Sequence, residues 1–580
     1  MMRTEADALP TLARESTGVS RYITRSTAIQ SAVVAATVIL VFAPILPIFY
    51  QALIDRPLYD DGQQFTLANL TDLLQSPNFW SVAQNTLVFA AATTIIAQVL
   101  GTTFAILIGR TDLPFKSFFA ELLIWPLYIS SLVLGFGWFM VYGPSGFVTL
   151  WVQSQFGEAP WTLYSITGMS IVAGISQMPL AMLYGLGSTA LSNPQLEDAA
   201  RSCGAGPWRT LRSVTLPLLM PSILYSSLLN FTIALEMLSI PLIFGEPARI
   251  GFFTTLLYTQ GISTPKPNYG LVAAGALILL AIVMLLVFLQ NRLLRNSQRY
   301  VTVGGKASRP KTLALGRWRL WALAFVSVYV VLFVILPTAV LFLRAGVSFL
   351  SPFVPFWTLF TLSHFHDIIS FPAYVRSIVN TIIISVVGGF GATFFVAMIA
   401  LVARRSKFPA ADKLEYVAMI PRSIPGLVVG IGFFYALVLL PPLGWLRNTI
   451  FVLMVAYTMR YIPTGYGAIS PALVQISTDM DRSARTTGAD WWTTVRLVIL
   501  PLIRPALFSS FALMFIHFFK EYSAAVFLFA PGSEVIGTTL LQFWVAGDMG
   551  RVAALSTIQI AVTVAFIYGI RKLLGVKIYG

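Results

Sequence analysis

The segment LEDAARSCGAGPWRTLRSVTLPLLMP, residues 196–221, is polar in a chain that is otherwise 57% hydrophobic and 11% charged. A second segment, MDRSARTTGADWWTTVRLVILPLIRP, covers residues 480–505. Each segment contains small residues, then a glycine, then basic residues and finally a Leu-Pro pair. In both copies the glycine precedes the proline of that pair by thirteen residues. A recurrence at fixed spacing indicates an internal repeat.

The rest of the chain is strongly apolar. Its mean hydropathy is +0.79, and apolar windows of about 20 residues, long enough to span a bilayer, recur along its length. We expect twelve transmembrane spans. They lie near residues 29–51, 84–108, 118–142, 162–189, 219–243, 268–290, 318–343, 378–403, 414–441, 449–472, 505–530 and 552–573.

Residues outside the two polar segments repeat as well. The offset between matched residues is 295 at first, then 284, 285 and finally 286. The matched pairs are Pro114 and Pro409, Gly135 and Gly430, Gly204 and Gly488, Glu236 and Glu521, and Gly251 and Gly537. Chance similarity of apolar helices does not keep Gly, Pro and Glu in order. The sequence therefore predicts an all-α integral membrane protein with about 12 transmembrane helices in two pseudo-symmetric six-helix halves.

The predicted halves divide the chain into five parts. We expect a cytoplasmic N-terminal tail over 1–28, a first half over 29–290 and a cytoplasmic basic linker over 291–317. The second half then covers 318–573, and a cytoplasmic C-terminal tail covers 574–580. The apolar stretch after the N-terminal tail is too long for a signal-peptide core, so we interpret it as a retained first helix.

The net charge of +15 is explained by the distribution of the basic residues. If the N-terminus is cytoplasmic, 28 of the 38 Lys and Arg residues fall in the tails and loops on the cytoplasmic side. This is the asymmetry that the positive-inside rule predicts. It favours a multi-pass membrane protein, in contact with lipid and with both termini cytoplasmic, over a nucleic-acid-binding protein.

Both polar segments fall on the cytoplasmic side by the same count. In the first, Ala199, Ala200 and Cys203 share one face of a helix, and Gly204 is positioned to end it. Small residues allow another backbone to approach closely. Two such segments with identical spacing favour docking of a partner protein over an ordinary surface helix.

These residues resemble the EAA loop of inner-membrane permeases of binding-protein-dependent ABC importers, whose pattern is E-A-A-x-x-x-G-x9-I-x-L-P. In the first copy Asp198 stands at the Glu position. The other matching residues of this copy are Ala199, Ala200, Gly204 and Pro217. The second copy matches at Ser483, Ala484, Gly488 and Pro501. It departs from the pattern at Arg482, which stands where the acid is expected, although Asp481 is adjacent.

The resemblance implies a type I importer permease in which each EAA loop is a coupling helix for an ATP-binding subunit. It implies two copies of that ATP-binding-cassette subunit and a periplasmic substrate-binding protein as partners. The chain contains no G-x-x-x-x-G-K-[ST] motif. We therefore expect ATP and Mg²⁺ to bind the partner subunit, and we expect this chain to be neither an enzyme nor a holder of a cofactor.

Two permease domains fused in one chain are most similar to ferric-iron importers. Thiamine and aminophosphonate importers share this layout, and sulfate and polyamine importers are related, so these cargoes stay open. Glu236 and Glu521 occupy matched positions in the fifth helix of each half. Charge at membrane depth is expensive and usually functional, so the two carboxylates are candidates for a cation path. The alternative is that each is locally paired, as Lys520 beside Glu521 suggests.

Two further interpretations are weaker. The cluster His364-Phe365-His366-Asp367 has metal-ligand chemistry, but it aligns with Asn69, Thr71 and Asp72 of the first half. We therefore interpret it as a recurring turn before a helix and predict no firm metal site. A secondary transporter with two six-helix halves would need no ATPase, and it offers no use for two EAA-like loops.

Overall fold

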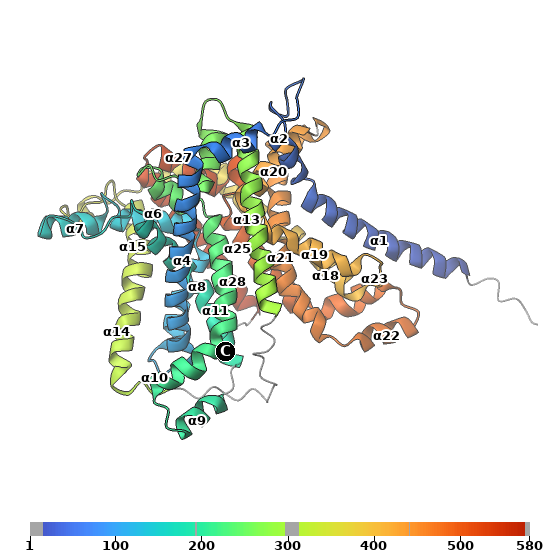
Figure 1. Cartoon of the computed structure of the whole chain (residues 1–580), viewed down its shortest axis with the longest axis horizontal. Helices are drawn as coiled ribbons and strands as arrows, with labels where there is room; N and C mark the ends of the chain where they lie inside the picture. Colours follow the sequence, from blue (N-terminus) through green and yellow to red (C-terminus); the bar gives the residue numbers. More distant parts are fainter. Residues whose placement is uncertain (1–15, 192–193, 296–312, 440, 575–580) are drawn as a thin grey trace, which may run out of the picture. The chain divides into compact units, whose positions relative to one another are not determined.

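The computed structural model describes residues 16–191, 194–295, 313–439 and 441–574. Within these ranges the backbone is helical, and β-structure is limited to three isolated bridges (Figure 1). Most of the predicted linker 291–317 and most of the predicted C-terminal tail 574–580 lie outside the described residues, as does the first part of the predicted tail 1–28. The helix before the linker continues to Arg295, and the first helix already begins at Ser16.

The helices up to Arg295 follow one another with short connections. They are α1 (Ser16–Phe42), α2 (Leu46–Ala52), α3 (Ala68–Gln75), α4 (Pro77–Arg110), α5 (Lys116–Tyr128), α6 (Ser131–Tyr142), α7 (Phe147–Phe156), α8 (Ile166–Leu191), α9 (Pro194–Ser202), α10 (Pro207–Thr210), α11 (Leu216–Leu235), α12 (Phe253–Tyr258) and α13 (Tyr269–Arg295). A π-helical turn, η1 (Leu211–Thr215), joins α10 to α11.

The helices after the linker repeat this order. They are α14 (Arg319–Val330), α15 (Leu336–Ala345), α16 (Ser363–Ser370), α17 (Pro372–Ile383), α18 (Gly389–Arg405), α19 (Ala411–Met419), α20 (Gly426–Leu439), α21 (Ile450–Gln475), α22 (Thr478–Thr486), α23 (Trp491–Thr494), α24 (Leu500–Leu502), α25 (Arg504–Lys520), α26 (Ala525–Leu528), α27 (Ile536–Val545) and α28 (Met549–Leu574). The π-helical turn η11 (Val495–Ile499) follows α23.

Element boundaries confirm the tandem repeat. Helix α4 begins at Pro77 and ends at Arg110, and its counterpart begins at Pro372 and ends at Arg405, so both ends keep the 295-residue offset. Both ends of α8 and α21, of α9 and α22, and of α10 and α23 keep the 284-residue offset. The protein is thus an all-α chain of two homologous halves. The insertion in the first half contains α7, which has no helical counterpart between α20 and α21 apart from a 3-10 segment.

The described residues contain 9 helices that are long and apolar enough to cross a membrane, or up to 11 if each of two bent helix pairs is one span. Three of the expected spans differ in detail. The window 118–142 is two helices, α5 and α6, and the window 414–441 is likewise divided between α19 and α20. The window 505–530 ends early, because α25 stops at Lys520.

The third helix of each half is divided at the same place. Two residues separate α5 from α6, which begins at Ser131, and α20 begins 295 residues after α6. Proline lies close to both breaks, inside α5 at Pro126 and before α20 at Pro425. Because proline lacks an N–H and restricts the residue before it, it favours an interruption of a long apolar helix.

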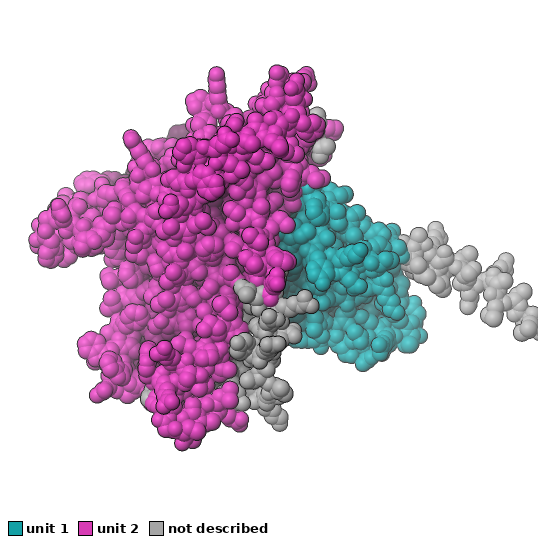
Figure 2. Space-filling model, in the orientation of Figure 1, with its two compact units in different colours: residues 1–43, 385–422, 458–515 teal, residues 44–384, 423–457, 516–580 magenta. Residues whose placement is uncertain are grey.

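By their contacts, residues fall into two compact units that do not coincide with the two halves (Figure 2). Unit 1 comprises residues 1–43, 385–422 and 458–515, and unit 2 comprises residues 44–384, 423–457 and 516–580. Unit 1 therefore contains α22, and unit 2 contains α9.

Within unit 2 the halves exchange helices. A Cβ added at Gly137 of α6 would lie 2.9 Å from the carbonyl oxygen of Pro337, which is on α15 in the second half. Gly432 of α20 packs in the same way against the carbonyl of Pro44, just before α2. Only glycine allows these close backbone approaches. In each half, the residues near the end of the first span thus pack on the other half: Pro44 on α20 and Pro337 on α6.

One predicted match between the halves is wrong. Asn85 Nδ2 donates to the carbonyl of Gly251 at 3.1 Å, and Asn380 Nδ2 donates to the carbonyl of Glu534 at 2.9 Å. Gly251 therefore corresponds to Glu534, at an offset of 283, and not to Gly537 at 286. The matching of glycine to glycine was misleading here, because the hydrogen bond uses only the backbone carbonyl and any residue can supply it.

Candidate functional site

The two polar segments each form a short helix that ends at a glycine. Helix α9 is followed by Gly204 with φ of +82°, and α22 is followed by Gly488 with φ of +87°. The N–H of the next residue, Ala205 or Ala489, donates to the carbonyl five residues back at 3.0 and 3.1 Å. This is the Schellman arrangement, which needs a residue in the left-handed region. The expected helix stop at each glycine is confirmed.

The small residues of these helices lie largely at the surface. In α9, Ala199 is exposed and Ala200 is half-buried, as is Asp198. In α22, Ser483 is exposed and Ala484 is half-buried. No residue of α22 is buried, and a Cβ added at either glycine would meet no atom within 4 Å. Among the described residues, the small faces of both helices thus remain largely accessible, which a docking surface requires.

A buried ion pair attaches α9 to the end of α4. Arg110 Nη2 lies 3.4 Å from Glu197 Oε1, and the two side chains are 1% and 5% exposed. Thr215 Oγ1, at the end of η1, donates to the same carboxylate oxygen at 2.9 Å. Glu197 thereby joins three elements: the C-terminal end of α4, the short helix α9 and the turn that leads into α11.

The second half has the same arrangement in unit 1. Arg405 Nη1, at the end of α18, lies 3.3 Å from Asp481 Oδ2 of α22, and the side chains are 5% and 14% exposed. Arg405 Nη2 also donates to the carbonyls of Leu473 and Ile476, the latter at 2.6 Å. These carbonyls lie at the C-terminal end of α21, where a cation is favourable. Arg405 thus fixes α22 and the end of α21 together.

The sequence pattern points to Asp198 and Arg482, with Asp481 only as a neighbour, and it does not indicate Arg110, Arg405 or Glu197. In each copy the preceding residue, Glu197 or Asp481, is the one that contacts the arginine. The signal was present: Arg110 and Arg405 differ by 295 residues, and the two acids differ by 284, which are the repeat offsets on either side of the insertion. Matching charged residues between the halves would have paired them.

The Leu-Pro pairs mark the entry into the next helix. Pro217 is the second residue of α11, and Pro501 is the second residue of α24. A π-helical turn, η1 or η11, comes directly before each pair. Since proline cannot donate a backbone hydrogen bond, a widened turn at this point avoids the clash that a regular helix would have.

The matched carboxylates in the fifth helix have different surroundings. Glu236 Oε2 accepts a hydrogen bond from the N–H of Gly426 at 3.2 Å. Glu521 is 6% exposed, and its Oε1 accepts from Ser523 Oγ at 2.7 Å and from the N–H of Ala524 at 3.2 Å. Each carboxylate therefore accepts at least one backbone hydrogen bond.

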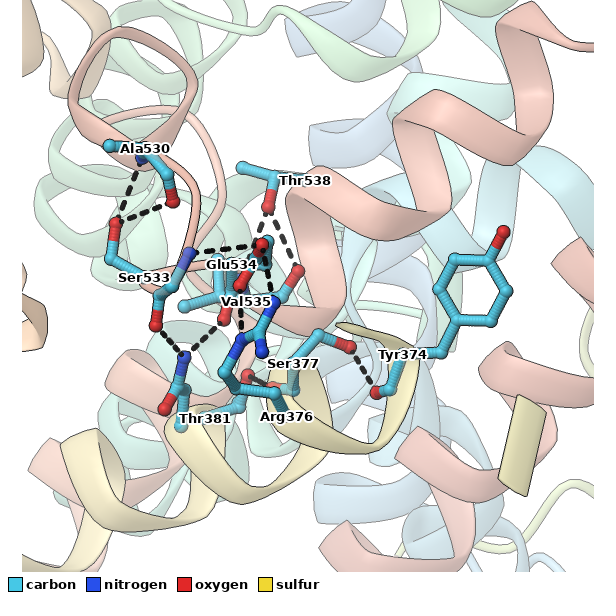
Figure 3. A network of polar contacts seen from close by, with 11 residues as sticks. Tyr374, Arg376, Ser377, Thr381, Ala530, Ser533, Glu534, Val535 and Thr538 are labelled. Atoms are coloured by element: carbon cyan, nitrogen blue, oxygen red, sulfur yellow. Dashed lines mark hydrogen bonds and ion pairs between the residues drawn. The ribbon is translucent and has the colours of Figure 1, made fainter. Parts of the chain in front are cut away.

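A polar network on the second half fixes the segment before α27 (Figure 3). Arg376 of α17 holds both carboxylate oxygens of Glu534, at 2.9 and 3.1 Å. This contact lowers the pKa of Glu534 from 4.5 to about 2, because the guanidinium and the N–H of Gly532 both stabilise the ionised form. The first half keeps the asparagine and threonine of this network but has Ser81 in place of Arg376.

His364 and Asp367 of the segment 364–367 form hydrogen bonds to other parts of the fold. His364 Nε2 lies 3.2 Å from Arg344 Nη1 and 3.1 Å from the carbonyl of Val347. Asp367 accepts from Arg551 at 3.0 Å. Among the described residues, no three His, Cys, Asp or Glu side chains are grouped as a metal site would need. A Cβ on Gly550 would meet His364 just as one on Gly270 would meet Asn69, which confirms the predicted match between His364 and Asn69.

Comparison with known proteins adds three similarities. The family model described as "Binding-protein-dependent transport system inner membrane component" matches residues 101–299 and 396–575. The ferric transport system permease protein FbpB of Actinobacillus pleuropneumoniae is 24% identical over 522 residues, which are 88% of this chain and 73% of that protein. The putative ferric transport system permease protein FbpB 1 of Haemophilus influenzae is 24% identical over 496 residues, covering 82% and 75%.

A shorter relative matches one half of the chain. The putative 2-aminoethylphosphonate transport system permease protein PhnV of Salmonella paratyphi A is 25% identical over 251 residues, which are 43% of this chain and 91% of that protein. A protein of that length corresponds to a single half of the tandem repeat. Both copies of the repeat contribute to the family match, because its two matched ranges contain α9 and α22 respectively.

Proposed function

Because the chain belongs to the family of binding-protein-dependent transport system inner membrane components, we propose that it is the membrane-spanning permease of an ATP-driven bacterial importer. The observation that carries this proposal is the duplicated helix-glycine unit. Helices α9 and α22 have the same length, the same left-handed glycine and an equivalent Arg-carboxylate ion pair. A fused permease needs two such units, one for each ATP-binding subunit.

In this proposal α9 and α22 are coupling helices. Asp198, Ala199, Ala200 and Gly204 contact one ATPase subunit, and Ser483, Ala484 and Gly488 contact a second copy. Pro217 and Pro501 lie where each unit joins its next helix. Movement of the ATPase subunits passes through the ion pairs to α4 and α18, which are attached to the coupling helices by buried charges. Separating a buried pair without compensation is costly, so each coupling helix moves together with the helix end that it contacts.

ATP and Mg²⁺ bind the partner subunits, and this chain performs no hydrolysis. We place the protein in the bacterial inner membrane with both termini on the cytoplasmic side, so that α9 and α22 face the cytoplasm. A periplasmic binding protein delivers the cargo at the opposite face. The observation that supports this orientation is the concentration of Lys and Arg residues in the loops on the side of α9 and α22.

For the cargo we propose ferric iron. The support is the similarity of most of the chain, 88% and 82% of its length, to two ferric transport permeases. The 2-aminoethylphosphonate relative covers 43% of the chain, so its cargo is the second candidate. We further propose that Glu236 and Glu521 line the route, since carboxylate oxygens are ligands that a small, highly charged cation prefers.

The test is reconstitution of the permease with its ATPase and binding protein in lipid vesicles. Iron-loaded binding protein should stimulate ATP hydrolysis and ATP-dependent uptake of radiolabelled iron. Stimulation by thiamine, 2-aminoethylphosphonate, sulfate or a polyamine, with none by iron, would replace the cargo and keep the transporter class. Uptake driven by an ion gradient without any ATPase would instead show a secondary transporter and contradict the proposal.

A further inference from the structure

The break in the third helix of each half leaves helix ends within an apolar stretch of the chain. Helix α5 ends at Tyr128 with its last carbonyls unpaired within the helix, and α20 begins at Gly426 with its first N–H groups in the same situation. Such groups need partners, because no water is present in the hydrocarbon core. The two breaks are equivalent positions of the repeat, since α6 and α20 begin 295 residues apart.

Each of these helix ends receives a charged side chain from the fifth helix of the other half. Lys520, the last residue of α25, donates from Nζ to the carbonyl oxygen of Leu127 in α5 at 2.8 Å. Glu236, which directly follows α11, accepts at Oε2 from the N–H of Gly426 at 3.2 Å. Both contacts lie in unit 2 and both join the first half to the second.

The sign of each charge suits the helix end that it contacts. A helix carries partial positive charge at its N-terminus and partial negative charge at its C-terminus. The carboxylate of Glu236 is at the N-terminus of α20, and the ammonium of Lys520 is at the C-terminus of α5. The two contacting residues lie one position apart in the repeat, because Lys520 corresponds to Leu235 and Glu236 corresponds to Glu521 at an offset of 285.

The fifth-helix segment of each half thus contacts a helix end of the other half. In one contact a lysine donates to a carbonyl, and in the other a glutamate accepts from an N–H. Glu521, the counterpart of Glu236, turns instead to its own segment and accepts from Ser523 and Ala524. In that segment the backbone of Ala524 lies against Gly430 of α20, where an added Cβ would be 2.5 Å from the Ala524 carbonyl oxygen. The fifth helix of the second half therefore reaches both broken helices, by Lys520 and by this close packing.

We propose that Lys520 and Glu236 form a pair of cross-half latches that stabilise the resting state of the permease. This inference rests on the proposed function, since it concerns the state that persists until loaded binding protein arrives. The halves of an importer must move against each other during transport, and contacts between a side chain of one half and a helix end of the other must change when they do. Lys520 and Glu236 are positioning residues: they set the balance between states and touch no ATP.

The test measures ATP hydrolysis by the complete complex of permease and ATPase subunits in lipid nanodiscs, without binding protein. Lys520→Met removes the donor and keeps an unbranched stem, and Glu236→Ala removes the acceptor. Each variant should raise this basal hydrolysis roughly tenfold, as expected when one helix-end charge contact no longer favours the resting state. The double variant should raise it further.

A conservative variant and two control variants distinguish the loss of these contacts from a general loss of structure. Lys520→Arg keeps a positively charged donor, so it should stay near the wild-type basal rate. Glu246→Ala and Lys266→Met remove an exposed acid and an exposed base outside these contacts and should also have no effect.

Two results would overturn the proposal. Unchanged basal hydrolysis in assembled Lys520→Met and Glu236→Ala complexes would overturn the proposal. Failure of both to assemble would overturn it too, because the contacts would then be required for the fold and not for switching. If no loaded binding protein stimulates the wild-type complex, the proposed function fails. That outcome is separate from the test of the latches, which depends only on the basal rates of the variants.

Discussion

Arg110 and Glu197 form an ion pair that is almost completely buried, with 1% and 5% of their side chains exposed and 3.4 Å between the charged atoms. They lie at the end of a long helix and on a short surface helix respectively. The pair recurs in the second half as Arg405 and Asp481. A connection of this kind, present twice in one chain, indicates how the motion of a surface helix reaches a transmembrane helix.

Breaking this pair should harm transport more than it harms the membrane insertion of the chain. Arg110→Met leaves the Glu197 carboxylate buried without its cation, a change that costs about 3–5 kcal/mol in buried pairs. We expect a lower melting temperature and loss of ATP-dependent uptake. Arg110→Met with Glu197→Met should recover melting temperature but not uptake, since the polar attachment to Thr215 is also lost. Uptake at the wild-type rate in the double variant would contradict the role assigned to the pair.

The exposed ion pair on the second coupling helix provides the matched control. Arg482 and Asp479 are 3.3 Å apart, and their side chains are 77% and 76% exposed. Exposed pairs contribute little. Arg482→Met should therefore leave the melting temperature unchanged.

The glycines that end the coupling helices should tolerate no bulky charge. Gly204→Asp and Gly488→Asp should each abolish uptake while the chain still inserts. No atom lies within 4 Å of an added Cβ, so the loss arises from the left-handed backbone, about 1–2 kcal/mol for a non-glycine residue, and from the blocked docking surface. Western blots of membranes check insertion, and Gly206→Asp, also exposed but without positive φ, is the control. The second loop should tolerate change better than the first, because Arg482 stands where the family has an acid.

The proposed iron path is tested by neutralising its two carboxylates together. Glu236→Gln with Glu521→Gln preserves hydrogen-bond acceptors and shape, so the complex should assemble. Iron uptake should fall sharply, because the site loses both negative charges. Radiolabelled iron that enters at the normal rate in this variant would show that the carboxylates have only the local roles seen in their hydrogen bonds.

Acid should destabilise the segment before α27 in a defined window. The pKa of Glu534 is lowered from 4.5 to about 2 in the fold, chiefly by Arg376. A depressed pKa stabilises the folded state fully above pH 4.5, and this contribution is lost as pH falls toward about 2. The melting temperature of the purified permease should drop across this window, and Arg376→Met should make the drop smaller. An identical pH profile in the variant would contradict this assignment.

The sequence predicted the repeat, the helical class and the two glycine-ended helices because these depend on local signals: apolar length, turn residues and spacing. Gly204 and Gly488 take the left-handed conformation that the sequence pattern requires. The breaks after α5 and before α20 could not be predicted in the same way. An apolar run of 25 residues around Pro126 is equally compatible with one bent span or with two helices.

The long-range contacts also could not be predicted from local sequence patterns. Arg110 lies 87 residues before Glu197, and no local pattern joins them. The Lys520 ammonium donates to a carbonyl 393 residues away, a partner that no local pattern indicates. Tertiary packing decides such partners, and only comparison of the two halves could have indicated the ion pairs in advance.

The central claim is that α9 and α22 are the docking sites for two ATPase subunits, and the single cysteine of the chain allows a direct measurement. Cys203 is exposed at the end of α9, and Thr487 is the exposed counterpart after α22. A thiol-specific photo-crosslinker on Cys203, or on Thr487→Cys in a Cys203→Ser background, should join the permease to the ATPase subunit after illumination. The same reagent on Gln155→Cys, exposed on α7, should give no such product. Crosslinks to the ATPase from both α9 and α22 positions are predicted, and their absence from both in an assembled complex would contradict the account.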